Sequence, residues 1–500
     1  MASNKPKQQI WGSRLSVPPD QLNIEFCAGR DVKSLPMADE VLFKYDIWTN
    51  LAHSKMLCKT GIISQEELKE LSNALLDLFE KHEHGKFTLD PEKEDVHVNI
   101  EHFITQQKGA EAGKKIHSGR SRNDQVATDM RLYLRDQLVI AAENLLQLIG
   151  QILDKAENEK KSIMPGFTHY QPAMITTAGH WMTAWSQALL RDADRITRNI
   201  VELNSSPLGA AASFGTSWAI DREYSSSLLG FEKVDENSLD SICSRGEYEA
   251  MIASNFSMMM NHLGTISQDI ILLSTPYYDM LHIDDRYVTG SSIMPQKRNP
   301  DFAEVVRSKA AYCHGTTTSL LGILKGSMSG YNRDIQQSKY LIIDLFRECS
   351  SAPLILSDVC KTMTFKHKNM EKQCQMGFMN AADVADWMAQ TFDLAFRECY
   401  EVLSLAVKYS DEAGKLTHDA LTRAIKETNV SIEITVEDVN LLNTPSSIIN
   451  QKKHTGGPAV ESVEKMIINQ RDHLKAIALE LGETKQKIAK ARKRCFEAVP

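Results

Sequence analysis

Residues 134–152 read LRDQLVIAAENLLQLIGQI, and this stretch decides the fold class. Its apolar side chains recur at intervals of 4, 3, 4, 3 and 4 residues, at Leu134, Leu138, Ala141, Leu145, Leu148 and Ile152. A second stretch has the same spacing, at Ile252, Phe256, Met259, Leu263, Ile266 and Ile270. Such heptad seams are typical of helices that pack lengthwise at a small crossing angle. The sequence therefore predicts an all-α protein built around a bundle of long helices.

The regions around these seams extend the helical pattern. Residues 189–201 and 302–324 also read as helices, whereas 430–436 is rich in strand-forming residues but too short for a sheet domain. Proline and glycine mark breaks at 165–166 and 289–300. Two apolar seams in one chain also leave surplus apolar surface, which favours burial in a symmetric oligomer.

Composition is that of an ordinary globular protein and argues against several classes. The net charge of −8 disfavours nucleic acid as a partner, and the basic run at 485–494 lies in a helical pattern and reads as a solvated face. The N-terminus has no apolar signal core, and no apolar run is long enough to span a bilayer, so we expect no membrane partner. The nine cysteines are odd in number and contain no CxxC pair. Free thiols in a reducing compartment fit this usage, and we expect a cytoplasmic protein.

Four polar segments interrupt the helical background, and the first two flank the first seam. Residues 117–125 (HSGRSRNDQ) place two arginines just before a helix, where Asn123 or Asp124 is expected as the N-cap. This segment is either a capped helix start with solvated arginines or an anion site. Residues 166–172 (GFTHYQP) carry His169 in a break between helices. That histidine is either a hydrogen-bonded structural residue or an acid–base catalyst.

The other two segments lie on either side of 302–324. Residues 289–300 (TGSSIMPQKRNP) form the most specific pattern, because a Gly-Ser-Ser turn can expose N–H groups and a hydroxyl while Lys297 adds a cation. Residues 331–339 (YNRDIQQSK) either form a polar surface loop or place Tyr331, Gln336 and Lys339 on one side of a turn.

Motifs for metals and nucleotides do not occur in the sequence. The chain contains no HExxH, no paired CxxC and no Asp-rich metal loop, and His97 and His102 stand five apart, a poor spacing for one helix face. It also contains neither GxGxxG nor GxxxxGK followed by Ser or Thr. We therefore predict no metal site, no dinucleotide site and no P-loop.

In this order, the four segments resemble the argininosuccinate lyase branch of the fumarase/aspartase superfamily, which includes the δ-crystallins. GSSIMPQKRNPD (290–301) is similar to the superfamily signature. Gln296 favours this branch, because fumarases and aspartases usually carry Gly there and adenylosuccinate lyases usually carry Tyr. HSGRSRNDQVATDMRLYLRD (117–136), PGFTHYQPA (165–173), YNRDIQQSK and the opening WGSRL also resemble the family's patterns. The resemblance spans nearly the whole chain, and five ordered motifs are far more specific than any one of them.

The resemblance implies a mostly helical fold in three parts: an N-terminal domain (1–115), a central bundle of long helices (116–366) and a C-terminal helical domain (367–500). It implies a homotetramer in which each active site is assembled from three subunits, without metal or cofactor. The implied activity is β-elimination of a small-molecule substrate, argininosuccinate, to L-arginine and fumarate.

The family's functional residues carry over by motif. Ser291 and His169 correspond to the acid–base pair, Lys297 to a catalytic cation, and Glu304 to the carboxylate that orients His169. Further substrate contacts are implied for Asn123, Thr168 and Asn299 at the succinyl part, and for Arg122, Tyr331, Gln336, Lys339 and Ser34.

The chain departs from the family's pattern at three places. The segment around Ser34 aligns poorly, so this contact rests on weak similarity. The usual Gln and Pro after the THxQ motif are Met174 and Ile175. Residues 244–247 (SRGE) lack the usual Ser-x-Arg-Asp order. These departures concern substrate contacts and leave the residues of the elimination itself in place.

The residue types suit the implied reaction. Loss of a proton from the carbon beside a carboxylate creates a dianion, which Lys297, Asn299 and the N–H groups of 290–292 would stabilise. We expect Ser291 to take the proton and His169 to serve the leaving nitrogen, although the sequence leaves the reverse assignment open. Two alternatives also stay open: another fumarate-releasing lyase of the superfamily, and a non-catalytic structural protein like the δ-crystallins.

Overall fold

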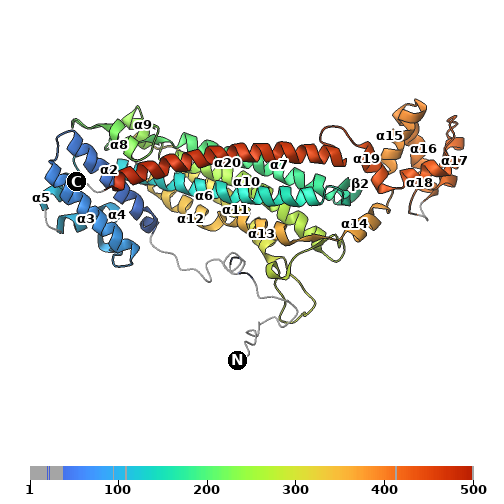
Figure 1. Ribbon diagram of the computed structural model, residues 1–500, viewed down its shortest axis with the longest axis horizontal. Coiled ribbons are helices and arrows are strands. Elements are labelled where there is room, and N and C mark those ends of the chain that lie inside the picture. The colour runs from blue at the N-terminus through green and yellow to red at the C-terminus, as the bar shows by residue number, and fades with distance from the viewer. Residues whose placement is uncertain are drawn as a thin grey trace.

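Long helices run side by side along the longest axis of the molecule (Figure 1). The computed structural model describes residues 20, 22, 38–93, 95–106, 110–410 and 414–497. The long helices are α6 (Arg122–Asn158), α7 (Ala178–Glu202), α10 (Glu247–Ser274) and α11 (Asp301–Leu324). Helix α7 packs along α6 and α10, and α10 also packs along α11. The predicted bundle of long helices, and with it the all-α fold class, is confirmed.

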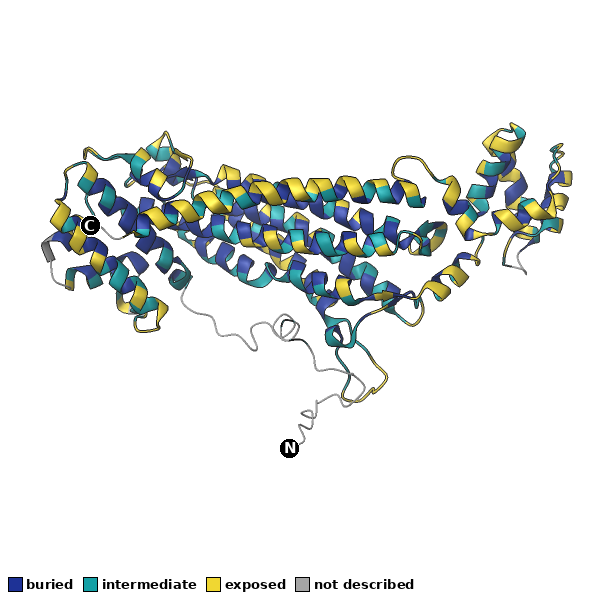
Figure 2. Ribbon diagram, viewed as in Figure 1, coloured by how far each residue is buried: buried dark blue, intermediate teal, exposed yellow. Residues whose placement is uncertain are grey.

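The two heptad seams form the core of this bundle. All twelve seam residues are buried, with 1% or less of their surface exposed. Figure 2 shows the buried residues inside the bundle and the exposed ones on its outer faces. Two shorter helices extend the packing: α12 (Gln337–Cys349) lies against α11, and α13 (Ala352–Thr362) lies against α6.

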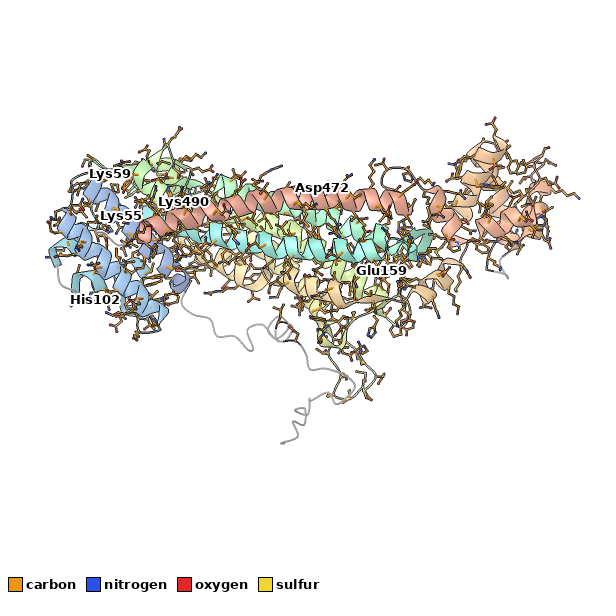
Figure 3. All side chains as sticks on the ribbon, viewed as in Figure 1. Lys55, Lys59, His102, Glu159, Asp472 and Lys490 are labelled. Atoms are coloured by element: carbon orange, nitrogen blue, oxygen red, sulfur yellow. The ribbon has the colours of Figure 1, made fainter. Side chains whose placement is uncertain are left out.

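The long C-terminal helix α20 (Val460–Phe496) also belongs to the bundle, since it packs along α6 and α7. Its outer side carries exposed charges such as Asp472 and Lys490 (Figure 3), and the basic run 485–494 lies largely on this solvated side. Helix α20 falls within the predicted C-terminal domain 367–500 but packs on the bundle. The division into three domains stays a prediction.

An N-terminal helical unit covers one end of the bundle, where α2 packs against α6 and α20 (Figure 1). Helix α3 begins with a capping box, because the Ser64 hydroxyl accepts the Glu67 N–H (3.2 Å) and the Glu67 carboxylate accepts the Ser64 N–H (2.8 Å). The elements are η2 (Ala38–Leu42), α2 (Phe43–Lys59), α3 (Gln65–Glu83), η3 (Pro91–Lys93), α4 (Val96–Gln106) and α5 (Ala110–Lys115).

A C-terminal unit lies beyond the opposite end and has its own apolar cluster (Figure 1). Residues 430–435 form no strand, which agrees with the expectation that this stretch builds no sheet domain. No helix in the described part of the chain is both long and apolar enough to cross a membrane. The unit consists of α14 (His367–Cys374), α15 (Ala381–Phe392), α16 (Phe396–Tyr409), α17 (His418–Glu427), α18 (Val436–Leu442) and α19 (Pro445–Gln451).

The sequence predicted only a loop between α6 and α7, but the chain forms a β-hairpin there. Strands β1 (Ile163–Thr168) and β2 (Gln171–Thr177) pair antiparallel, with His169 and Tyr170 as the two turn residues. Both turn residues have positive φ, 53° and 60°, as a type I′ turn requires. Asn-Gly usually occupies such turns, and its absence hid the hairpin from sequence analysis.

The remaining described elements are short and connect the helices at the bundle's two ends. They are β3 (Ser205–Ser206) paired with β4 (Lys233–Val234), β5 (Leu281–His282) paired with β6 (Thr364–Phe365), α8 (Arg222–Leu228), α9 (Ser238–Cys243), η4 (Asp285–Tyr287) and η5 (Arg333–Gln336).

Candidate active site

The start of α6 is fixed by a cap that differs from the predicted one. Ser121 is the N-cap, and Asp124 is the third residue of the helix, whose carboxylate accepts the Ser121 N–H (2.8 Å). The other carboxylate oxygen of Asp124 accepts the N–H groups of Gly209 (2.8 Å) and Ala211 (2.9 Å). The prediction of Asn123 or Asp124 as N-cap was wrong, because Asp124 is held in the first turn of the helix by a loop distant in sequence.

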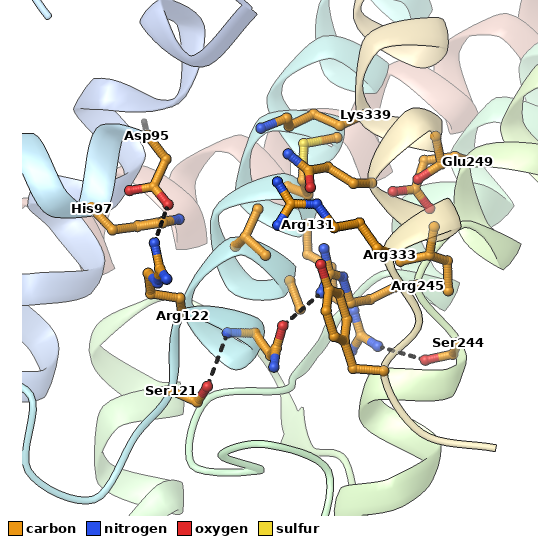
Figure 4. Close-up of a pocket in the computed structure, with 18 of the residues that line it drawn as sticks. Asp95, His97, Ser121, Arg122, Arg131, Ser244, Arg245, Glu249, Arg333 and Lys339 are labelled. Atoms are coloured by element: carbon orange, nitrogen blue, oxygen red, sulfur yellow. Dashed lines mark hydrogen bonds and ion pairs between the residues drawn. The ribbon is translucent and has the colours of Figure 1, made fainter. Parts of the chain in front are cut away.

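Beside this helix start lies a cavity of about 490 Å³, between the N-terminal unit and the bundle (Figure 4). Its walls come from the starts of α6 and α10, from η5 and α12, and from the N-terminal unit. Five of the predicted substrate contacts line it: Arg122, Asn123, Tyr331, Gln336 and Lys339. The structure therefore brings two of the four polar segments, 117–125 and 331–339, into one site.

The cavity is rich in cations, and several of them are held by buried or half-buried carboxylates. Arg122 contacts Asp95 (3.1 Å), and Lys339 forms an ion pair with Asp39 in which both side chains are buried. Arg131 pairs with Asp235 (2.9 Å) and also donates to the Ser205 carbonyl oxygen (2.6 Å). These pairs fix the positive groups in place before any ligand arrives, which suits a polyanionic substrate.

In the cavity wall, His97 lies against two buried carboxylates. Its Nδ1 is 2.9 Å from Asp46 and 3.7 Å from Asp129. Burial raises the pKa of Asp129 well above its ordinary value, and the neighbouring Asp46 adds to this. Burial would also raise the pKa of Asp46, but His97 and Arg120 lower it below its ordinary value.

This His97 cluster tests the expectation that the chain has no metal site. The three side chains could hold an ion, since their ligand atoms lie within 4.8 Å of one another. Hydrogen-bond distances and the charge of Arg120 fit a proton-sharing cluster better than a cation site. Sequence spacing could not find this cluster, because its members come from α2, α4 and α6.

The hairpin tip lies at the opposite end of α6 from the cavity. At about 1.5 Å rise per residue, the 37 residues of α6 separate Asn123 from the hairpin by roughly 55 Å. Thr168 and His169 are both exposed, and His169 has no side-chain hydrogen bond among the described residues. Thr168 borders a second cavity of about 1070 Å³, which lies between the hairpin, α7, α10 and the C-terminal unit.

Residues 289–300, here called the signature loop, form an exposed loop closed at its base. Thr289 and Asn299 exchange two backbone hydrogen bonds (3.0 and 2.9 Å). The Ser291 hydroxyl accepts the Met294 N–H (3.1 Å), while Lys297 is exposed. Glu304 is exposed in the first turn of α11, and no hydrogen bond joins it to His169 in the described structure.

The predicted site residues therefore lie in three separate places of one chain. Helix α10 rises about 42 Å between the cavity and the region of the signature loop, and α11 rises about 36 Å on the way back to Tyr331. The cavity holds five of the predicted residues, the hairpin tip holds Thr168 and His169, and the signature loop region holds Ser291, Lys297, Asn299 and Glu304. Ser34 lies outside the described residues.

The chain matches two sequence families and is similar to several named proteins. It matches the family described as Lyase over residues 33–315 and the family described as Argininosuccinate lyase C-terminal over residues 378–450. Argininosuccinate lyases of Hahella chejuensis and Desulforamulus reducens are each 37% identical over 475 residues, which is 95% of this chain and 99% and 100% of theirs. A crystal structure of EDDS lyase in complex with formate superposes with a TM-score of 0.88 at 25% identity, over 97% of this chain and 96% of that one.

Proposed function

The chain belongs to the argininosuccinate lyase family, and we propose that it acts as a homotetramer whose active sites are shared between subunits. It is a lyase that cleaves argininosuccinate to L-arginine and fumarate. The proposal of a shared site rests on one observation: the predicted site residues lie in separate places of one chain. Five predicted substrate contacts line one cavity, while the predicted acid–base residues, exposed His169 and partly buried Ser291, lie about a helix length away.

The bundle supports assembly because its helices expose large apolar side chains. Val201 on α7, Met258 on α10 and Leu321 on α11 are 56%, 43% and 55% exposed. Burial of such side chains between bundles would favour association at about 25 cal/mol per Å² of apolar surface. In a tetramer, the hairpin of one subunit and the signature loop of another would meet the cavity of a third.

At such a site, the cavity would bind the charged substrate and the two exposed segments would supply the chemistry. Ser291 takes the proton from the carbon beside a carboxylate, and Lys297 and Asn299 stabilise the dianion that forms. His169 serves the leaving nitrogen, and Glu304 of another subunit orients it. A serine is a poor base in water, so the signature loop has to close over the substrate and exclude solvent.

We also infer a cytoplasmic location for the enzyme. Every cysteine in the described part of the chain is a free thiol, including the neighbouring pair Cys313 and Cys349, whose sulfurs lie 3.4 Å apart. Close thiols that stay reduced fit a reducing compartment. Fractionation of the source cells, followed by activity assay of each fraction, tests this inference.

The function is tested with purified protein and four substrates: argininosuccinate, adenylosuccinate, aspartate and malate. Ultraviolet absorbance reports fumarate in each case. Fumarate is expected from argininosuccinate alone, and activity is expected to survive treatment with a chelator. Light scattering should give about 225 kDa, four times 56.2 kDa. Fumarate from another substrate only, or full activity in a monomer, would overturn the proposal.

A further inference from the structure

Arg245 stands apart from the other cations of the cavity because it has no carboxylate partner. Arg122, Arg131 and Lys339 each form an ion pair, and Arg333 is exposed. Arg245 is partly buried, yet among the described residues no carboxylate lies within 4.0 Å of its guanidinium. A charge that is taken out of water without a counter-ion lowers stability, so such a group points to a partner that the chain alone does not supply.

Glu249, the carboxylate whose charge acts on Arg245, is already engaged elsewhere. Glu249 accepts the Gly246 N–H (2.8 Å) as part of the capping box of α10. Burial lowers the pKa of Arg245 below its ordinary value, and the charges of Glu249 and Tyr331 only partly oppose this. The cavity therefore presents a guanidinium whose charge is not neutralised.

The neighbours of Arg245 connect it to the substrate site. It donates weakly to the side-chain oxygen of Asn123 (3.4 Å), and its guanidinium lies over the Tyr331 ring, 5.2 Å from the ring centre. Figure 4 shows Arg245 among the labelled residues that line the cavity. Its other N–H groups have no hydrogen-bond acceptor among the described residues and remain free to bind a ligand in the cavity.

The residue directly after Arg245 carries no carboxylate. It is Gly246, which has a φ of 87°. A side chain there would also meet Leu324, because its Cβ would lie 2.9 Å from the Leu324 Cδ2. A side chain at position 246 would therefore be strained, and with glycine there Arg245 has no carboxylate on the next residue.

We propose that Arg245 binds a carboxylate of the succinyl part of the substrate, together with Asn123. A guanidinium matches a carboxylate with two parallel N–H···O bonds, whereas a lysine offers only a point charge. The proximity of Asn123, expected at the succinyl part, selects this end of the substrate over the arginine end. This inference rests on the proposed function and adds a specificity residue to it.

Succinate is a suitable probe because it has both carboxylates but cannot react. Its binding to the assembled enzyme is measured by calorimetry, and so is that of arginine. Arg245→Gln should weaken succinate binding about 10- to 100-fold, as expected for loss of hydrogen bonds to a charged group, and should leave arginine binding within about twofold. Arg245→Lys should retain part of the succinate affinity. Arg397→Gln is the control, because Arg397 also lies over a tyrosine ring (6.0 Å from Tyr400) but is exposed on α16.

The outcomes separate this inference from the proposed function. If Arg245→Gln lowers kcat but binds succinate normally, Arg245 only positions Asn123 and Tyr331, and the inference is wrong. If arginine binding is lost and succinate binding is kept, Arg245 serves the opposite end of the substrate and the inference is also wrong. If the wild-type enzyme does not cleave argininosuccinate, the proposed function fails first. Circular dichroism and light scattering check that each variant folds and assembles, and Arg245→Lys carries the test if the glutamine variant does not fold.

Discussion

The cavity and the two exposed segments, the hairpin tip and the signature loop, are built in opposite ways. In the cavity, Lys339 is 7% exposed and paired with Asp39, and Arg131 is held by Asp235. At the exposed segments, Tyr170 next to His169 is 67% exposed, and Ile293 next to the paired serines is 82% exposed. One chain fixes the charged groups of the cavity, whereas the proposed acid–base residues lie on segments that, in the proposed tetramer, a second chain would complete.

This difference predicts that the exposed segments matter for activity and not for folding. Ser291→Ala and His169→Asn should each lower kcat about 10²- to 10⁴-fold, because each removes one acid–base group. Their melting temperatures should match the wild type, since both side chains are at least partly exposed. The controls are Ser308→Ala and His102→Asn. They change exposed residues of the same types that belong to neither the cavity, the hairpin tip nor the signature loop. A loss of less than tenfold at either site would remove that residue from the acid–base pair.

The cavity is expected to respond differently, with activity and stability lost together. Lys339→Met leaves the buried carboxylate of Asp39 without its counter-ion and should lower the free energy of unfolding by about 3–5 kcal/mol. Urea denaturation measures this loss. Lys366→Met is the matched control, because Lys366 and Asp279 are each 41% exposed and such a pair contributes about 0–1 kcal/mol. Equal losses for the two variants would contradict the picture of a rigid cavity.

The pair Arg131–Asp235 gives a smaller effect that depends on pH. Burial alone would raise the pKa of Asp235, but Arg131 and two serine hydroxyls lower it below its ordinary value. A lowered pKa means that this carboxylate stabilises the fold above its ordinary pKa and that the contribution is lost as the pH falls through the lowered value. The melting temperature of Asp235→Asn should therefore fall less steeply below pH 4 than that of the wild type. Parallel curves for the two proteins would show that the pair contributes nothing in this range.

Helical periodicity predicted the bundle correctly because a heptad seam can only be buried against other helices. Leu145 and Leu263 lie in the core as that argument requires. The hairpin was missed because His169 and Tyr170 carry a turn that the usual Asn-Gly signal does not mark. The packing of α20 on the bundle was also missed, since an amphipathic pattern says which face is buried and not against which neighbour.

The sequence predicted only those residues of the site that belong to recognisable motifs. Asn123, Tyr331 and Lys339 line one cavity, and their role as substrate contacts stays a prediction. The other features of the site depend on contacts between residues that are distant in sequence. His97 meets Asp46 and Asp129 from three different helices, and the missing partner of Arg245 depends on every carboxylate around it. Neither arrangement produces a characteristic spacing of residues in the sequence, so sequence analysis could not predict it.

The shared active site is tested most directly by mixing two inactive variants. Ser291→Ala and His169→Asn each remove one proposed acid–base group at a position that is at least partly exposed, and both should leave the bundle and the cavity intact. If the two groups reach a site from different subunits, mild denaturation and refolding of an equal mixture should restore about one quarter of the wild-type activity, because each residue is intact in half of the subunits. Each variant treated alone should stay inactive. Mixed tetramers that form, as native mass spectrometry would show, and that remain inactive would contradict the shared site.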